Sequence, residues 1–337
     1  MHYKLQGPAG LYRTSRVTGK MPTMERTIAS WMLGLALLAG CRAETTPPVP
    51  PLSDPPPRPI VALSGEALAP VELSEEARAK HEATLRAARE EQESNPSIDS
   101  TIWVGRRTAD LGRYHEAIEI FTEGLETYGD DAALLRHRGH RYITTRQLEL
   151  ARADLERAAT LIEGTEDVIE ADGLPNAAGV PTSTLHTNIH YHLGLTRFLL
   201  GDLAGARSAY EACLNASTTD DMRVATAYWL TMTLVRLGDE EAADVLLSKF
   251  VGDIELYENF AYLRLLRLYQ GTLAPSALLG EDAEGLDRAT LGFGLGNLYM
   301  IQGDRTKAEA TWAEVLESPQ WAAFGYIAAE AELQRAR

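Results

Sequence analysis

The feature that most constrains the fold is a residue pattern that returns about every 34 positions. Read along the chain, it is large apolar, small, turn glycine, aromatic, small, aromatic, small. Gly139 lies 34 residues after Gly105 and begins a second copy of the pattern. A period of this length is typical of a protein built from stacked supersecondary units. The first copy contains Val104, Gly105, Gly112, Tyr114, Ala117, Phe121 and Gly124.

Three further copies follow. Gly194 lies 55 residues after Gly139, which is one period plus a 21-residue insertion at 164–184. The fourth copy has Thr231 at the small position, and the last copy is centred on Gly296. The pattern resembles the tetratricopeptide repeat, a pair of antiparallel helices in which small residues allow close approach and large residues fill the gaps. The resemblance implies an all-α fold of helix-turn-helix repeats stacked as a right-handed α-solenoid.

The resemblance divides residues 74–337 into successive units. No segment downstream of the first helix alternates apolar and polar residues, so we expect no sheet. Ser74 is a good N-cap for the first helix, whereas Pro275 and nearby glycines argue against a second helix in one degenerate repeat. We expect a half repeat at 74–96, repeats near 98–131, 132–163, 187–220 and 224–250, the degenerate repeat at 251–288, a repeat at 289–319 and a capping helix at 320–337.

The first forty residues are of a different kind. An almost charge-free run follows Arg26 and is too short to span a bilayer, but it has the length of a signal-peptide core. It ends in Leu38-Ala39-Gly40-Cys41, which resembles a bacterial lipobox. The resemblance implies a lipoprotein signal peptide at 1–40, with 1–23 a possible start-site artefact, and lipid attachment at Cys41. An ordinary secretory signal with an accidental cysteine is the alternative.

The segment after Cys41 is a lipid anchor and proline-rich linker at 41–73. Eight prolines between 46 and 59 hold that stretch extended, which is typical of a spacer. In lipobox proteins an Asp after the cysteine usually retains the protein at the inner membrane. Arg42 stands there instead, so we expect an outer-membrane lipoprotein facing the periplasm.

Charge excludes one class of partner. The chain has 32 Lys and Arg against 48 Asp and Glu, a net charge of −16, and loss of the signal peptide would change this to −20. An acidic surface repels phosphate, so we expect no nucleic-acid partner. Cys213 would then be the only thiol besides the lipid-attached one, which leaves no internal disulfide.

No catalytic or metal-binding motif is complete. His81-Glu82 and His115-Glu116 each lack the second histidine of a zincin motif. His186 and His190 have a metal-ligand spacing, but no Cys or carboxylate lies nearby in the sequence to complete a ligand set. We therefore expect neither an enzyme nor a cofactor or metal, and we interpret Cys213 as a buried thiol. The acidic pairs Asp130-Asp131 and Asp220-Asp221 are interpreted as helix caps.

The family resemblance also indicates which side chains face the concave groove. They come from the first helix of each repeat, and the lysine and asparagine set of the chaperone-binding carboxylate clamp is not among them. The candidate partner-binding residues are Ile102, Arg106, Arg136, His137, His140, Tyr191, His192, Phe198, Tyr228, Met232, Phe293 and Asn297.

One segment of this groove stands out in an acidic protein. Residues 136–146 contain four arginines and two histidines. This predicts a groove that is cationic in its amino-terminal half and aromatic in the middle, suited to a peptide with acidic and apolar side chains. The alternative is a solvated helix face whose arginines pair with neighbouring acids. The insertion at 164–184 either folds over these arginines as a lid or self-ligand, or is a surface elaboration.

The sequence thus predicts a lipid-anchored scaffold or adaptor that binds peptide or protein partners in a concave groove, in cell-envelope assembly. The alternative is a binder of small molecules or glycans in an aromatic groove. An open groove would favour the first function. A closed pocket with converging polar groups would favour the second.

Overall fold

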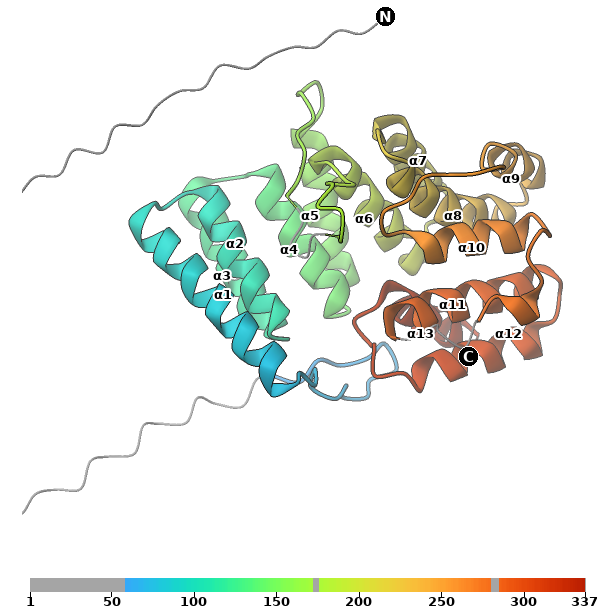
Figure 1. Ribbon diagram of the computed structural model, residues 1–337, viewed down its shortest axis with the longest axis horizontal. Coiled ribbons are helices and arrows are strands. Elements are labelled where there is room, and N and C mark those ends of the chain that lie inside the picture. Colours follow the sequence, from blue (N-terminus) through green and yellow to red (C-terminus); the bar gives the residue numbers. More distant parts are fainter. Residues whose placement is uncertain (1–57, 172–175, 280–284, 337) are drawn as a thin grey trace, which may run out of the picture. The chain divides into compact units, whose positions relative to one another are not determined.

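The computed structural model describes residues 58–171, 176–279 and 285–336. The predicted signal peptide, Cys41 and most of the proline-rich linker lie outside these ranges. The described residues form α-helices, one 3₁₀ turn and two isolated β-bridges, without a β-strand, so the predicted all-α fold of stacked helical repeats is confirmed (Figure 1). Among these helices none is both long and apolar enough to cross a bilayer.

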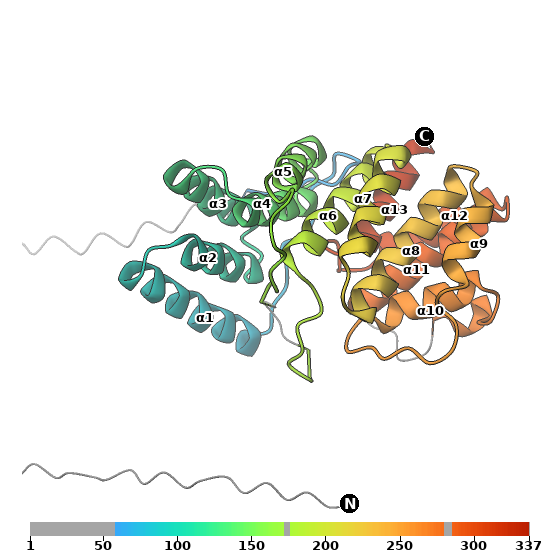
Figure 2. The ribbon, with the colours of Figure 1, turned by 90° about the horizontal axis from the view of Figure 1, so that it is seen from above.

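The helices follow one another in antiparallel pairs. Consecutive helices from α1 to α9 pack together along the chain, α10 packs on α8 and α11, and α6 also contacts α4, α8 and α13. Figures 1 and 2 both show α6 between the α1–α5 helices and the C-terminal helices. The helices are α1 (Glu75–Ser94), α2 (Ile98–Asp110), α3 (Tyr114–Tyr128), α4 (Ala132–Thr144), α5 (Leu148–Leu161), α6 (Leu185–Leu200), α7 (Leu203–Ala216), α8 (Asp220–Arg236), α9 (Glu240–Leu247), α10 (Phe260–Tyr269), η1 (Pro275–Ala277), α11 (Gly285–Ile301), α12 (Arg305–Leu316) and α13 (Phe324–Arg335).

Four glycines explain how the paired helices approach one another. Each lies sixteen residues before a large side chain of the partner helix: Gly105 before Phe121, Gly139 before Leu155, Gly194 before Tyr210 and Gly296 before Trp312. A Cβ on Gly139 would stand 2.9 Å from Leu155 Cγ, and one on Gly194 would stand 2.6 Å from the Tyr210 ring. Since both distances are below normal van der Waals contact, only glycine fits at these crossings.

A second position recurs seven residues after the small residue of each repeat, including Thr231 in the fourth, in the turn between the paired helices. Its φ is positive in all five repeats, and four repeats place glycine there: Gly112, Gly201, Gly238 and Gly303. The second repeat has Arg146 instead, with φ 61°, the one non-glycine residue with positive φ among those described. A left-handed conformation costs a non-glycine residue about 1–2 kcal/mol, so the Arg146 side chain must offset this cost.

The Arg146 side chain joins two distant parts of the chain. Its Nε and Nη2 donate to the Glu330 carboxylate on α13 at 3.0 and 2.9 Å, and Nη2 also donates to the Trp321 carbonyl oxygen at 2.7 Å. Both side chains of the ion pair are almost completely buried. The Leu63 amide donates to Glu330 as well, at 3.4 Å. We call the contacts of Arg146 with Glu330 and Trp321 the clasp.

Helix α13 is fixed against the inner helices at further points. Arg335 donates to the Leu199 carbonyl oxygen at the end of α6, and Arg236 of α8 pairs with Glu332 at 2.5 Å. Glu332 is buried, and its two arginine partners hold its pKa below the ordinary value despite that burial. The C-terminal helix therefore lies against α6 and α8, where the sequence predicts an open groove.

Asp131 and Asp221, both predicted as helix caps, have different roles in the structure. Asp131 caps α4, as predicted, by accepting from the Ala133 and Leu134 amides. Asp221 is not a cap of its own helix, because Thr219 caps α8. The buried Asp221 carboxylate accepts instead from the backbone amides of residues 257–259, which lead into α10. This contact sets the position of α10 against α8.

The close glycine crossings give a direct stability test. Gly139→Phe should lower the free energy of unfolding by about 1–3 kcal/mol, because the new ring overpacks the contact with Leu155. Leu150→Phe, at an exposed position of the neighbouring helix α5, is the matched control. Urea unfolding followed by circular dichroism measures both variants. An unchanged midpoint for Gly139→Phe would show that the helix register is wrong.

The clasp gives a second test. Arg146→Gly removes the left-handed strain but leaves Glu330 buried without its cation, so we expect a net loss of about 2–4 kcal/mol. Adding Glu330→Gln to Arg146→Gly removes the isolated charge and should recover part of this loss. The double-mutant cycle is measured by urea unfolding. Strictly additive effects of the two substitutions would contradict the coupling described here.

Candidate functional site

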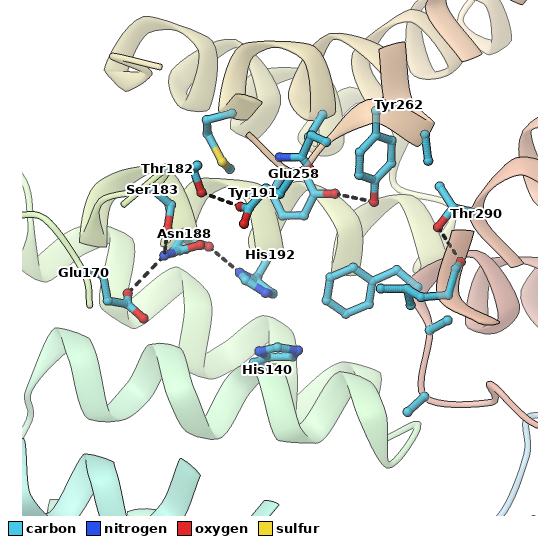
Figure 3. A pocket seen from close by; sticks show the side chains of 18 of the residues that line it. His140, Glu170, Thr182, Ser183, Asn188, Tyr191, His192, Glu258, Tyr262 and Thr290 are labelled. Carbon is cyan, nitrogen blue, oxygen red and sulfur yellow. Dashed lines mark hydrogen bonds between the residues drawn. The ribbon is translucent and has the colours of Figure 1, made fainter. Parts of the chain in front are cut away.

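The candidate site is a pocket of about 540 Å³ at the meeting point of several helices. It is lined by side chains of α2, α4, α6, α8, α10 and α11, by residues 170–171 and 182–183 of the insertion and by residues 322–324 at the start of α13. Figure 3 shows polar groups pointing into it from several of these elements. Its volume lies within the range of small-ligand pockets. The concave side is therefore a partly closed pocket here, bounded on one side by the C-terminal segment.

One end of the pocket is cationic and holds a carboxylate from the insertion. Glu170 forms an ion pair with Arg136 at 2.9 Å, lies 3.3 Å from His137 Nε2 and accepts from the Asn188 amide at 3.2 Å. The next residue, Ala171, accepts a hydrogen bond from Arg106 through its carbonyl oxygen at 2.7 Å. Two consecutive residues of the insertion, Glu170 and Ala171, thus contact Arg136 and Arg106 respectively.

The base of the insertion is tied down by its own contacts. Ile169 and Thr184 form an antiparallel bridge, and the Glu170 amide donates to the Ser183 carbonyl oxygen. Thr184 caps α6 and donates to Asp167 at 2.6 Å. These contacts place Glu170 at the pocket. The described base of the insertion lies against Arg106 and Arg136, which is the arrangement that the lid hypothesis requires.

His137 and His192 are buried, His140 is half-buried, and all three are neutral. Burial, reinforced by nearby arginines, holds the pKa of His137 and His140 well below 6.5 and lowers that of His192 to about 3. Arg136 donates to His137 Nδ1 at 2.9 Å, so the ring proton is on Nε2 and faces Glu170. His192 Nδ1 donates to the Asn188 carbonyl oxygen at 2.6 Å, which leaves its Nε2 as an acceptor.

Aromatic rings form the middle of the pocket. His140 and His192 face each other with centroids 4.5 Å apart (Figure 3). Phe324 packs against both rings. The Tyr191 hydroxyl accepts from the Trp229 indole at 2.9 Å and lies 3.1 Å from the Tyr262 hydroxyl. These fixed rings give the pocket a rigid apolar wall with polar tips.

The opposite rim is acidic. Glu258, in the segment that Asp221 positions, accepts from the Thr182 hydroxyl of the insertion at 2.5 Å. Asp287, near the start of α11, is the second carboxylate of this rim, and both side chains belong to exposed residues. The pocket therefore has arginines at one end and carboxylates at the other.

The predicted groove residues fall into two groups. Arg106, Arg136, His140, Tyr191 and His192 line the pocket, while His137 lies beneath Arg136 and Ile102 is buried in the core. The remaining predictions are corrected, because their side chains are buried and do not line the pocket. Tyr228 packs against Tyr262 and Tyr269 of α10, and Phe293 stacks between Trp229 of α8 and Trp312 of α12. The corrected residues are Phe198, Tyr228, Met232, Phe293 and Asn297.

The arginines of residues 136–146 do not form one cationic surface. Arg136 turns to the pocket, Arg138 makes a bidentate pair with Asp154 of α5, and Arg146 belongs to the clasp. Arg141 lies over the Tyr114 ring at 5.5 Å, and burial lowers its pKa to about 10. The alternative of a solvated, paired face is also inaccurate, because these arginines are largely withdrawn from solvent. Arg136 and Arg106 alone carry positive charge into the pocket.

Several pocket residues had no sequence signal that identified them. Asn188 is within the third repeat but outside its pattern, and Tyr262 and Phe324 are brought in by the packing of α10 and α13. Glu170 had a partial signal, since the insertion begins with acidic residues. Only the folded structure shows that Glu170 meets Arg136.

The other candidate chemistry is accounted for in the fold. Cys213 is buried, with its Sγ 3.3 Å from the Thr187 carbonyl oxygen, and burial raises the pKa of this thiol to about 12. His186 lies 3.1 Å from the Thr165 hydroxyl at the base of the insertion. In the described ranges no group of three or more His, Cys, Asp or Glu side chains is arranged to hold a metal ion.

One of the predicted repeats matches a known protein family. Residues 187–220, which cover α6 and α7, match the tetratricopeptide repeat. The chain contains a tetratricopeptide repeat. This match covers the third of the predicted repeats, which supplies Asn188, Tyr191 and His192 to the pocket. A search of curated proteins gave no match.

Solved structures of similar fold are distant. A tetratricopeptide repeat protein from Parabacteroides merdae is 17% identical over 76% of this chain and 92% of that chain, with a TM-score of 0.44. MamA from AMB-1 is 16% identical over 61% and 97%, with a TM-score of 0.36. A putative kinesin light chain from Podospora anserina is 14% identical over 78% and 100%, with a TM-score of 0.36. Similarity at this level says nothing about partners.

The neutral histidines predict acid sensitivity. A histidine whose pKa is lowered in the folded state stabilises the fold above its unfolded pKa of about 6.5, and this stability is lost as the pH falls below that value. Each of the three should contribute about 1.4 kcal/mol per pH unit below about 6.5. His140→Phe should reduce the slope of unfolding free energy between pH 7 and 5.5.

Urea unfolding at several pH values measures this slope. Leu150→Phe, which adds a ring at an exposed position and removes no titratable group, is the control and should keep the slope of the unsubstituted protein. An identical slope for His140→Phe would mean that His140 becomes protonated in the folded state over this range.

Proposed function

We propose that this protein is a non-catalytic binding protein that holds a short, extended segment of a protein partner in the pocket between α2, α4, α6, α10 and α13. Helical repeat proteins bind partners on the surface formed by their stacked units. The observation that supports the proposal here is that separate repeats place arginines at one end of the pocket, carboxylates at the other and aromatic rings between them.

The size and lining of the pocket favour a short segment over a folded surface. About 540 Å³ accommodates a few residues and not a domain. Hydrogen-bonding groups are available at both ends, and the rings of Tyr191 and Phe324 stand between them. Such an arrangement suits a chain with apolar and polar side chains in succession. The neutral His192, already bonded to a backbone carbonyl, is used here as a wall and not as a catalytic base.

We further propose that the protein is a lipoprotein of the bacterial cell envelope, anchored through Cys41 in the outer membrane and facing the periplasm. The support is the apolar run that ends in Leu38-Ala39-Gly40-Cys41, followed by Arg42 and the proline-rich linker. A spacer of this kind would hold the binding domain away from the membrane, so that it can act as an adaptor in envelope assembly.

A small molecule or glycan is the second candidate ligand. The observation that favours it is the partial closure of the pocket by residues 322–324 and by the base of the insertion. Of the predicted groove residues Tyr191, Tyr228 and Phe293, Tyr191 alone lines the pocket. Tyr262 and Phe324 supply the other rings.

A pocket-filling substitution tests the proposed function. Peptides are selected from a random phage-displayed library with the mature chain in detergent, and their dissociation constants are measured by fluorescence polarisation. Ala322→Trp should weaken the selected peptides at least tenfold, because the indole occupies the pocket. Ala204→Trp, at an exposed position of α7, is the matched control and should bind normally.

Two outcomes would contradict the proposal. Unchanged peptide affinity in Ala322→Trp would place peptide binding elsewhere on the molecule. Absence of any selected peptide, together with Ala322→Trp-sensitive binding on a glycan or metabolite array, would establish the second candidate instead.

A further inference from the structure

We propose that the cationic end of the pocket is a subsite for an acidic side chain of an extended peptide, and that Glu170 is an internal ligand that the peptide's carboxylate displaces. This inference rests on the proposed peptide-binding function and names the ligand chemistry of the same pocket.

The contacts of Glu170 are those of a bound acidic side chain. Its carboxylate is withdrawn from solvent, with 13% of the side chain exposed, and the side chains of Arg136 and His137 beneath it are exposed by only 9% and 6%. The Asn188 amide donates to this carboxylate, and the charged nitrogen of Arg136 and the Nε2 of His137 lie 2.9 and 3.3 Å from it. Charge-assisted donors that converge on one group make a specific carboxylate site.

The main chain at Glu170 and Ala171 is also hydrogen-bonded in this subsite. Arg106 donates to the carbonyl oxygen of Ala171, while the Glu170 amide bonds to Ser183 in the short antiparallel contact. Residues 170–171 therefore present an acidic side chain and the following main-chain carbonyl to two arginines. A peptide with an internal Asp or Glu offers the same two groups in the same order, whereas a chain-terminal carboxylate has no following carbonyl.

Arg106 contacts the insertion through a carbonyl oxygen and not through a carboxylate. Arg106 has no ion-pair partner within the described ranges, and it lies over the Trp103 ring at 4.5 Å. Burial and the neighbouring Arg136 lower its pKa. Asp110 is the acid nearest in the sequence, but it pairs with Arg107 at 3.0 Å. Glu170 thus pairs with Arg136, while Arg106 bonds to the carbonyl oxygen of the next residue.

Occupation by Glu170 must weaken the binding of any competing acid. An internal ligand reduces the fraction of binding-competent protein, and the apparent dissociation constant rises by the inverse of that fraction. Glu170→Gln keeps the size and hydrogen-bonding capacity of the side chain while removing its charge. The variant should therefore release the subsite without emptying it.

The experiment compares three synthetic pentapeptides by fluorescence polarisation. One has an internal Glu and blocked termini, the second has Gln in its place, and the third has Gln and a free C-terminal carboxylate. Glu170→Gln should bind the Glu peptide at least tenfold more tightly than the unsubstituted protein does, and the other two with unchanged affinity. Glu166→Gln, an exposed acid of the same insertion, is the matched control and should behave as the unsubstituted protein.

Two results would overturn the proposal. Equal or weaker binding of the Glu peptide by Glu170→Gln would show that Glu170 supports ligand binding instead of competing with it. A tighter affinity confined to the peptide with the free C-terminus would assign the subsite to chain ends. If Glu170→Gln folds poorly, Glu170→Asp, which shortens the reach to Arg136, should give an intermediate gain, and no gain contradicts the proposal.

Failure of this proposal is distinguishable from failure of the proposed function. If library-selected peptides bind and Ala322→Trp abolishes their binding, the pocket is a peptide site whatever Glu170 does. If no peptide binds to any variant, the proposed function itself fails.

Discussion

The arrangement of the pocket depends on the buried ion pair between Arg146 and Glu330. Four repeats place glycine at the corresponding turn, and the arginine adopts the same left-handed backbone at a cost of about 1–2 kcal/mol. In return its guanidinium holds α13 and the Trp321 carbonyl oxygen. Residues 322–324 follow directly and form one wall of the pocket. A strained turn in the second repeat thus sets the position of a wall contributed by the C-terminal segment.

The sequence was a good guide to features that depend on neighbouring residues. Glycine sixteen positions before a large side chain reports a contact within one helical pair, as for Gly139 and Leu155, so the repeat and its register could be predicted from spacing alone. The effect of Pro275 was also local, because in the described part of that segment the chain forms a short 3₁₀ turn after α10. The role of Asp221 could not be predicted, since its hydrogen-bond donors are 36 or more residues away.

The candidate site was predicted in part for the same reason. Arg106, Arg136 and Tyr191 were found because a concave face follows from the repeat pattern. Phe293 was misplaced, since nothing in its own segment indicates that Trp229 of α8 and Trp312 of α12 stack on its ring. The positive charge of residues 136–146 is evident from the sequence, but the acidic side chains that pair with these arginines are not. Those partners come from α5, the insertion and α13, and they send each arginine in a different direction.

The clasp also bears on how the chain folds. In an array whose units contact only their neighbours, terminal units can fray independently and folding spreads from any nucleus. Arg146 and Glu330 are 184 residues apart, so their contact closes a long loop and carries a large entropic cost until the intervening repeats are in place. We therefore expect the clasp to form last. Once formed, it makes fraying of the C-terminal helix cost a buried ion pair, which turns a linear array into a cooperative unit.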